Sequence, residues 1–134
     1  MSQRLEVDVV GIERAAGRIG AEEAAGMCAR ALAAAGVADG HAAVEFVSPA
    51  RIRELNRAHR WRDAATDVLS FPVDAATASA GPRELGDVVV CPERARDLRE
   101  AVVHGALHLA GLDHESDRGE MLALQREVLA GGVG

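Results

Sequence analysis

The chain has 134 residues, of which 49% are hydrophobic and 27% are charged, as in an ordinary globular domain that can bury a sizeable core. Its formal net charge is −6, so the total charge does not indicate a nucleic-acid-binding protein, although a local basic patch can still bind phosphates. No apolar run approaches the roughly 18 residues that a membrane span needs. We therefore expect a single domain over residues 1–134 and no membrane partner.

Predicted strands and helices alternate in the first half of the chain. Arg4–Val10 alternates and is rich in Val, which predicts a strand, and His41–Val47 is predicted to be the second strand. Between them, Ala21–Ala35 is predicted to be an Ala-rich helix that a glycine ends. Ser48–His59 is predicted to be another helix, because a serine N-cap is followed by proline in the first turn.

Two short apolar strands are predicted in the second half, at Val68–Phe71 and Asp87–Val90. The segment between them, Asp74–Glu84, is small, polar and Gly/Pro-bearing, so it is predicted to be a loop. A helix is predicted to begin at Pro92 and to run into a histidine-rich segment, and Asp117–Glu120 resembles a capping box before the last helix. This alternation predicts an α/β or α+β fold with one sheet.

The cysteines and the N-terminus indicate the compartment. Cys28 and Cys91 are far apart and form no CxxC pattern, so we interpret them as small buried hydrophobes and not as a disulfide framework. That usage favours a reducing environment. The first residues, MSQRLEVDVVG, lack the apolar run of a signal peptide. We expect a cytoplasmic protein.

Residues 104–114, HGALHLAGLDH, contain three of the five histidines in the chain. His104 and His108 are four residues apart, so on a helix they lie on one face, one turn from each other. Apolar residues cover most of the rest of this helix, which predicts a buried helix whose histidine strip faces a cleft or a polar partner. Gly111 offers the left-handed conformation that ends a helix, so the chain can turn back and bring His114 to the same point.

Three neutral imidazoles are suitable ligands for one Zn²⁺ ion, at N–metal distances of roughly 2.0–2.1 Å. Three protein ligands leave a coordination position for water, as in catalytic zinc sites. Nickel and cobalt stay open, because affinity order and availability decide among these metals. A single histidine on a helix is usually a surface or core residue, but three with a glycine at the turn favour a metal site.

The spacing H-x₃-H-x₂-G-x₂-H matches the long zinc-protease motif, except that Gly105 stands where those proteases have the glutamate that activates water. The sequence therefore favours a metal hydrolase and argues against a peptidase. We expect Gly105 to allow a close approach to the metal or to the substrate backbone. Asp113 and Glu115 flank the third histidine, and we favour supporting or turn roles for them.

Five arginines fall within twelve residues: Arg51, Arg53, Arg57, Arg60 and Arg62. A guanidinium matches phosphate oxygens bidentately, which is one interpretation of such a group. A solvated helix face with ordinary Glu–Arg pairs is the other, and we prefer it for Arg51 and Arg53. For Arg60, just past the predicted helix and before a strand, both interpretations stay open.

Three stretches carry a family resemblance: HGALHLAGLDH, residues 54–72 (ELNRAHRWRDAATDVLSFP) and residues 85–93 (LGDVVVCPE). Together they resemble the YbeY-type endoribonucleases, the bacterial rRNA maturation factors, over roughly residues 40–130. The chain departs from the family pattern at Ala65, where Pro is common, and at His59, where an aromatic residue is common. The run between Cys91 and His104 is also shorter than is usual in that family.

The resemblance implies one α/β domain, with a mixed sheet of about four strands and helices packed on it. It implies one zinc per chain held by His104, His108 and His114, and it places the family's functional arginine, catalytic and substrate-binding, at Arg60. It further implies hydrolysis of single-stranded RNA, maturation of the 3′ end of 16S rRNA, and ribosome quality control. The implied partners are ribosomal RNA and the small ribosomal subunit, not DNA.

Two other functions stay open. The first is a non-catalytic ribosome-assembly factor with a structural metal, and the second is a metal hydrolase of another substrate. A structural zinc site normally has a closed fourth position, often Cys, and Cys91 is distant in sequence from the histidines. This disfavours the assembly factor.

Overall fold

The computed structural model describes residues 5–60, 67–73, 83–113 and 117–131. For residues 59 and 60 it describes the backbone and not the side chains. The elements in these ranges are β1 (Leu5–Val10), η1 (Ile12–Ala15), α1 (Ala21–Ala34), β2 (Gly40–Phe46), α2 (Pro49–Arg60), β3 (Val68–Pro72), β4 (Glu84–Val90), η3 (Pro92–Arg94), α3 (Leu98–Leu109) and α4 (Glu120–Leu129). The predicted strands and the two helices of the first half are confirmed, within a few residues at their ends. None of the described helices is long and apolar enough to cross a membrane.

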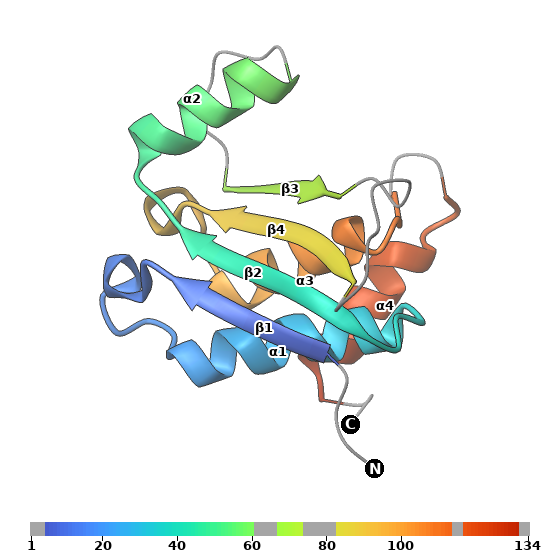
Figure 1. The fold of residues 1–134 in the computed structure, drawn as a ribbon. Helices are drawn as coiled ribbons and strands as arrows, with labels where there is room; N and C mark the ends of the chain where they lie inside the picture. The colour runs from blue at the N-terminus through green and yellow to red at the C-terminus, as the bar shows by residue number, and fades with distance from the viewer. Residues whose placement is uncertain (1–4, 61–66, 74–82, 114–116, 132–134) are drawn as a thin grey trace.

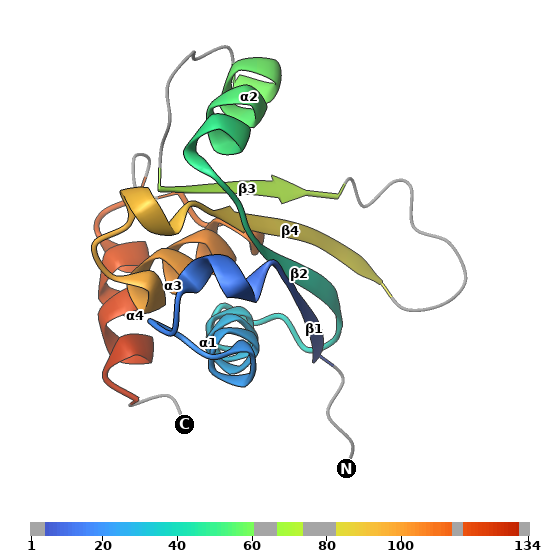
Figure 2. The ribbon, with the colours of Figure 1, turned by 90° about the vertical axis from the view of Figure 1, so that its left-hand side faces the viewer.

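One mixed sheet organises the molecule, as predicted. Its strand order is β1-β2-β4-β3; β1, β2 and β4 are parallel, and β3 is antiparallel to β4 at one edge. Helices α1, α3 and α4 lie together on one side of the sheet, whereas α2 stands beyond β3 (Figures 1 and 2). The α/β class with helices packed on one four-stranded sheet is therefore confirmed.

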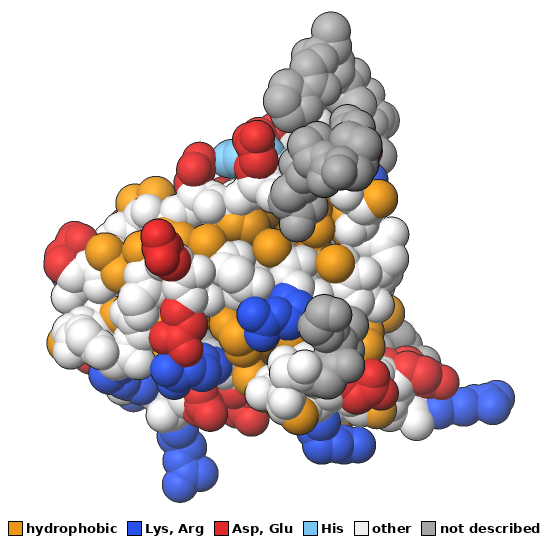
Figure 3. Space-filling model, turned by 90° about the horizontal axis from the view of Figure 1, so that it is seen from below, with side chains coloured by type: hydrophobic (Ala, Val, Ile, Leu, Met, Phe, Trp, Pro, Cys, Tyr) orange, Lys and Arg blue, Asp and Glu red, His pale blue; other side chains and the backbone are white. Residues whose placement is uncertain are grey.

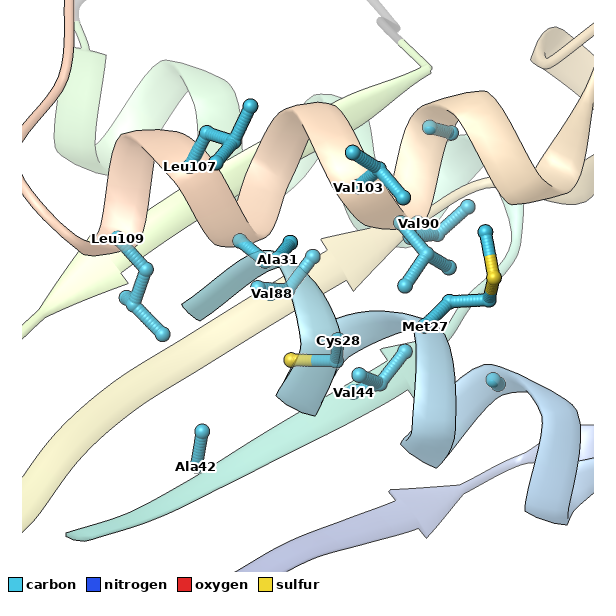
Figure 4. Packing of buried hydrophobic residues seen from close by; sticks show 14 of the residues in the cluster. Met27, Cys28, Ala31, Ala42, Val44, Val88, Val90, Val103, Leu107 and Leu109 are labelled. Atoms are coloured by element: carbon cyan, nitrogen blue, oxygen red, sulfur yellow. The ribbon is translucent and has the colours of Figure 1, made fainter. Parts of the chain in front are cut away.

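The main core lies between the sheet and helices α1, α3 and α4, and small aliphatic side chains dominate it. Figure 4 shows the facing side chains of α1 (Met27, Cys28, Ala31), β2 (Ala42, Val44), β4 (Val88, Val90) and α3 (Val103, Leu107, Leu109). A smaller cluster on the other side of the sheet holds α2 through Ile52, with Leu69, Val89 and Cys91. Both cysteines are buried free thiols, as predicted, and burial raises the pKa of Cys28 to about 12.

Strand β4 begins at Glu84, three residues earlier than predicted. The register against β2 shifts here, since His41 pairs with Glu84 and Ala42 with Gly86. Gly86 has φ +126°, and a Cβ there would lie 2.2 Å from the carbonyl oxygen of Phe71. Gly86 thus lets β4 pass close to β3 while both stay in the sheet.

The prediction that a helix begins at Pro92 is wrong. Pro92 opens only the 3₁₀ turn η3, and α3 begins after Asp97, whose carboxylate accepts hydrogen bonds from the N–H groups of Arg99 (3.0 Å) and Glu100 (3.2 Å). The guanidinium of Arg18 donates to the carbonyl oxygens of Pro92 and Ala95, both at 2.7 Å. These bonds stabilise the non-helical connection between η3 and α3, so the two do not form one continuous helix.

The end of α3 follows the prediction closely. Gly111 has φ +104°, its N–H donates to the carbonyl of His108 (2.9 Å), and the N–H of Leu112 donates to the carbonyl of Leu107 (3.1 Å). These two bonds form a Schellman motif, which turns the chain back after the helix.

The start of α4 agrees with the predicted capping box in part. Asp117 accepts hydrogen bonds from the N–H groups of Gly119 (2.8 Å) and Met121 (2.9 Å). Glu120 reaches back, but it accepts from Arg118 and not from Asp117 as in a standard capping box. The carboxylates of Asp117 and Glu120 therefore both bind backbone N–H groups at the start of α4, but not the pair of N–H groups that a standard capping box uses.

Candidate metal centre

The two described histidines of the predicted metal site lie on an otherwise buried stretch of α3. Between Ala101 and Leu109 every residue is buried except His104 and His108, which are half-buried. Their ring centroids are 4.7 Å apart and the rings are nearly perpendicular. The predicted histidine strip on a buried helix is therefore confirmed.

The Nδ1 atom of each ring faces an oxygen that can only accept a hydrogen bond. His104 Nδ1 lies 2.8 Å from Oε1 of Gln125 in α4, and His108 Nδ1 lies 2.9 Å from the carbonyl oxygen of Leu112. An acceptor at this distance places the proton on Nδ1, so the lone pair of each neutral imidazole is on Nε2. Metal-binding histidines commonly have this arrangement, with the second ring nitrogen donating to a carbonyl or carboxylate oxygen.

The Schellman turn therefore has two effects at this site. It reverses the chain after α3, and it places the Leu112 carbonyl against the ring of His108. The chemistry of these two imidazoles fits a zinc ion, which takes nitrogen from neutral histidine. In the described part of the chain, no three His, Cys, Asp or Glu side chains come together as a metal site. The third predicted ligand, His114, lies outside the described residues.

The other predicted site residue, Arg60, is the last residue of α2, and its side chain also lies outside the described part. Among the described arginines of this helix, Arg51 agrees with the interpretation of a solvated face. Arg51 forms an exposed ion pair with Glu54 at 2.6 Å. An open groove runs along the start of α2. It is lined by Ser48, Ala50, Arg51, Arg53, Glu54 and Arg57.

Gly105 does make a close approach, but the approach is to the sheet and not toward a metal or a substrate. A Cβ at this position would lie 2.5 Å from Cγ1 of Val88 and 2.8 Å from Cγ2 of Val68. Ser70 adds to the contact, because its hydroxyl donates to the Gly105 carbonyl at 2.7 Å. The glycine therefore lets α3 lie directly on β4 and β3.

A second polar group, on the opposite face of the sheet, was not predicted. His41 in β2 lies between Asp8 of β1 and Glu84 of β4, with Nε2 2.8 Å from Asp8 and Nδ1 2.9 Å from Glu84. The Nδ1 contact lacks hydrogen-bond geometry, so it acts as a charge contact. The bond to Asp8 and the charge of Glu84 raise the pKa of His41 despite partial burial. Seen from below, acidic side chains lie beside a histidine on the surface (Figure 3).

Asp87 in β4 does not lie on the side of the sheet that α3 covers. Asp87 is exposed and alternates with residues that face α3, so it lies on the outer face with His41. Desolvation, and secondarily the charge of Glu84, raise its pKa. The backbone carbonyl of Asp67, just before β3, accepts a hydrogen bond from the N–H of Cys91 at 2.9 Å.

Comparison with known proteins identifies the family. The family model for endoribonuclease YbeY matches residues 18–131 of the chain. The chain belongs to the YbeY family of endoribonucleases. A YbeY endoribonuclease from Rubrobacter xylanophilus is 40% identical over 131 residues, which cover 92% of this chain and 93% of the relative.

Other YbeY relatives support the assignment. One from an Anaeromyxobacter species is 45% identical over 115 residues, and these cover 77% of this chain and 59% of the relative. The solution structure of TM1509 from Thermotoga maritima has a TM-score of 0.55 at 28% identity, and the match covers 94% of this chain and 90% of that one. The fold of this chain is therefore similar to that of TM1509.

Proposed function

We propose that this YbeY family member is a zinc-dependent endoribonuclease that cleaves single-stranded RNA and matures the 3′ end of 16S rRNA. Family membership supports hydrolysis of RNA. The observation that carries the metal dependence is the pair His104 and His108, each with Nδ1 against an oxygen acceptor. Ribosomal RNA and the small ribosomal subunit are the proposed partners. The proposed compartment is the cytoplasm, in keeping with the two buried free thiols.

In this proposal, His104, His108 and His114 hold the zinc. Zinc bound there supplies Lewis acidity and activates water. The chain's own residues orient the two described imidazoles, because the oxygens of Gln125 and Leu112 face their Nδ1 atoms and leave Nε2 for the metal. The buried apolar sides of α3 restrict water to the histidine strip.

Arg60 has the second role. Cleavage of a phosphodiester adds negative charge to the phosphoryl oxygens, and a fixed guanidinium stabilises that charge. The chain has no Lys, so an arginine is its available fixed cation. We propose Arg60 for this role, because the segment that contains it resembles the one that carries the functional arginine of the YbeY family.

The test measures zinc per chain, thermal unfolding, and cleavage of a short single-stranded RNA. We expect about one zinc per wild-type chain, loss of zinc and cleavage in His108→Ala, and loss of most cleavage with full zinc content in Arg60→Ala. Arg51→Ala is the matched control, since Arg51 lies in an exposed ion pair on the same helix. Equal cleavage by Arg60→Ala and Arg51→Ala would assign Arg60 to the solvated face.

Two results would replace the proposal. Wild-type protein that cleaves no single-stranded RNA with any divalent metal, but binds small ribosomal subunits, would favour the assembly factor. Metal-dependent hydrolysis of casein would show a peptidase, which we do not expect because the position after His104 is a glycine packed against Val88.

A further inference from the structure

Gln125 is a buried polar side chain of α4 that faces the histidine strip of α3. Only 8% of its surface is exposed, and Asn56 is the other buried polar side chain among the described residues. Burying an amide is unfavourable unless it is hydrogen-bonded. The bond that Gln125 makes is to Nδ1 of His104, 21 residues earlier in the chain.

The orientation of this amide decides which nitrogen of His104 carries the proton. With Oε1 toward the ring, as in the structure, the proton is on Nδ1 and the lone pair is on Nε2. With the NH₂ group toward the ring, Nδ1 would be the acceptor and the proton would be on Nε2. The second arrangement prevents Nε2 from binding a metal.

We propose that Gln125 is a positioning residue of the metal site, which holds His104 in the tautomer and ring orientation that a metal requires. The inference rests on the proposed metal site. Its structural basis is that the acceptor comes from a different helix: His108 takes its acceptor from the turn that follows α3, whereas His104 depends on α4. Met121, which is fully buried one turn before Gln125, holds α4 against the core and so fixes where Gln125 lies.

Three variants separate the hydrogen bond from packing. Gln125→Met keeps the length of the side chain but removes the acceptor. Gln125→Glu keeps an oxygen acceptor and cannot present a donor as a carboxylate. Val128→Ala is the matched control, because it removes buried packing from α4 and leaves the bond to His104 in place.

Zinc affinity, measured by competition with a chromophoric chelator, is the first readout. We expect Gln125→Met to bind zinc roughly 10- to 100-fold more weakly than wild type, the range typical for loss of such a partner. Gln125→Glu should bind at least as tightly as wild type, and Val128→Ala should stay within about threefold of it. If Gln125→Met does not fold, Gln125→Ala is the second variant without an acceptor.

The second readout is the histidine ¹⁵N spectrum of the metal-free protein, which reports the tautomer directly. We expect the Nδ1–H form for His104 in wild type and its loss in Gln125→Met. An Nε2–H form in wild type, wild-type affinity in Gln125→Met, or equal weakening by Gln125→Met and Val128→Ala would each overturn the inference and leave the metal site standing. Weakening by Gln125→Glu would do the same. Wild-type protein that binds no zinc would overturn both the metal site and the inference.

Discussion

Gly105→Ala tests whether this glycine is required for packing. The added Cβ would lie 2.5 Å from Val88 Cγ1 and 2.8 Å from Val68 Cγ2. Valine side chains are stiff at χ1, so they cannot rotate out of the way at low cost. Either α3 must move away from the sheet, or the valines must leave their rotamers.

The magnitude follows from two opposing contributions. Overpacking a core by one carbon destabilises a protein by about 1–3 kcal/mol. Alanine in a helix interior is about 0.5–1 kcal/mol more favourable than glycine, which offsets part of that cost. Because both contacts are shorter than 3.0 Å, we expect a net destabilisation of about 1–2 kcal/mol. For a chain of this length, that corresponds to a decrease in Tm of ~3–8 °C.

Gly26→Ala is the matched control for this substitution. Gly26 also lies inside a helix, α1, but a Cβ there would have no heavy atom within 4 Å. The same change should therefore stabilise the protein by about 0.5–1 kcal/mol. Urea unfolding of both variants measures the difference.

A double-mutant cycle with Val88→Ala identifies the contact. Val88→Ala removes the nearer of the two clashing atoms, so the two changes together should be less destabilising than their sum by roughly 1 kcal/mol. A Gly105→Ala variant as stable as Gly26→Ala, or additive effects in the cycle, would refute the packing role of Gly105.

Two further predictions concern stability away from the metal site. Because Asp8 and Glu84 raise the folded-state pKa of His41, its contribution is full below the unfolded value near 6.5 and is lost as pH rises through the raised value. The difference in unfolding free energy between wild type and His41→Gln should therefore shrink with rising pH, and urea unfolding from pH 5 to 9 that showed a constant or growing difference would contradict this. Arg18→Met removes the donors to the carbonyls of Pro92 and Ala95 and should destabilise the protein by about 1–3 kcal/mol. If the effect is no larger than that of Arg126→Met, at an exposed position, these two hydrogen bonds do not stabilise the fold.

The strands were predictable where burial alternates along the sequence. β2 buries every second residue, from Gly40 to Phe46, and this period of two is visible in the sequence. The start of β4 was not predictable, because Gly86 usually signals a turn and its need for space comes from Phe71 on the neighbouring strand. The start of α3 was missed for a similar reason: the bonds that separate it from Pro92 come from Arg18, 74 residues earlier in the chain.

The histidine strip was predictable because its signal is local. His104 and His108 are spaced by one helical turn, and the residues around them are apolar. The hydrogen-bond partners of these histidines were only partly predictable. The turn that supplies the Leu112 carbonyl was expected from Gly111, but Gln125 shows no pattern in the sequence that connects it to His104. The same is true of His41, because parallel pairing brings Asp8 and Glu84 to it from distant segments.

The position of Gly105 also changes the comparison with the zinc proteases. A side chain at position 105 would point from α3 into the sheet. In this fold that direction leads into Val88 and Val68. A glutamate there would displace the sheet before its carboxylate could reach the histidine strip. Glycine at this position is therefore a condition for α3 to lie flat on β4 and β3, and position 105 cannot itself supply the residue that accepts a proton during RNA cleavage.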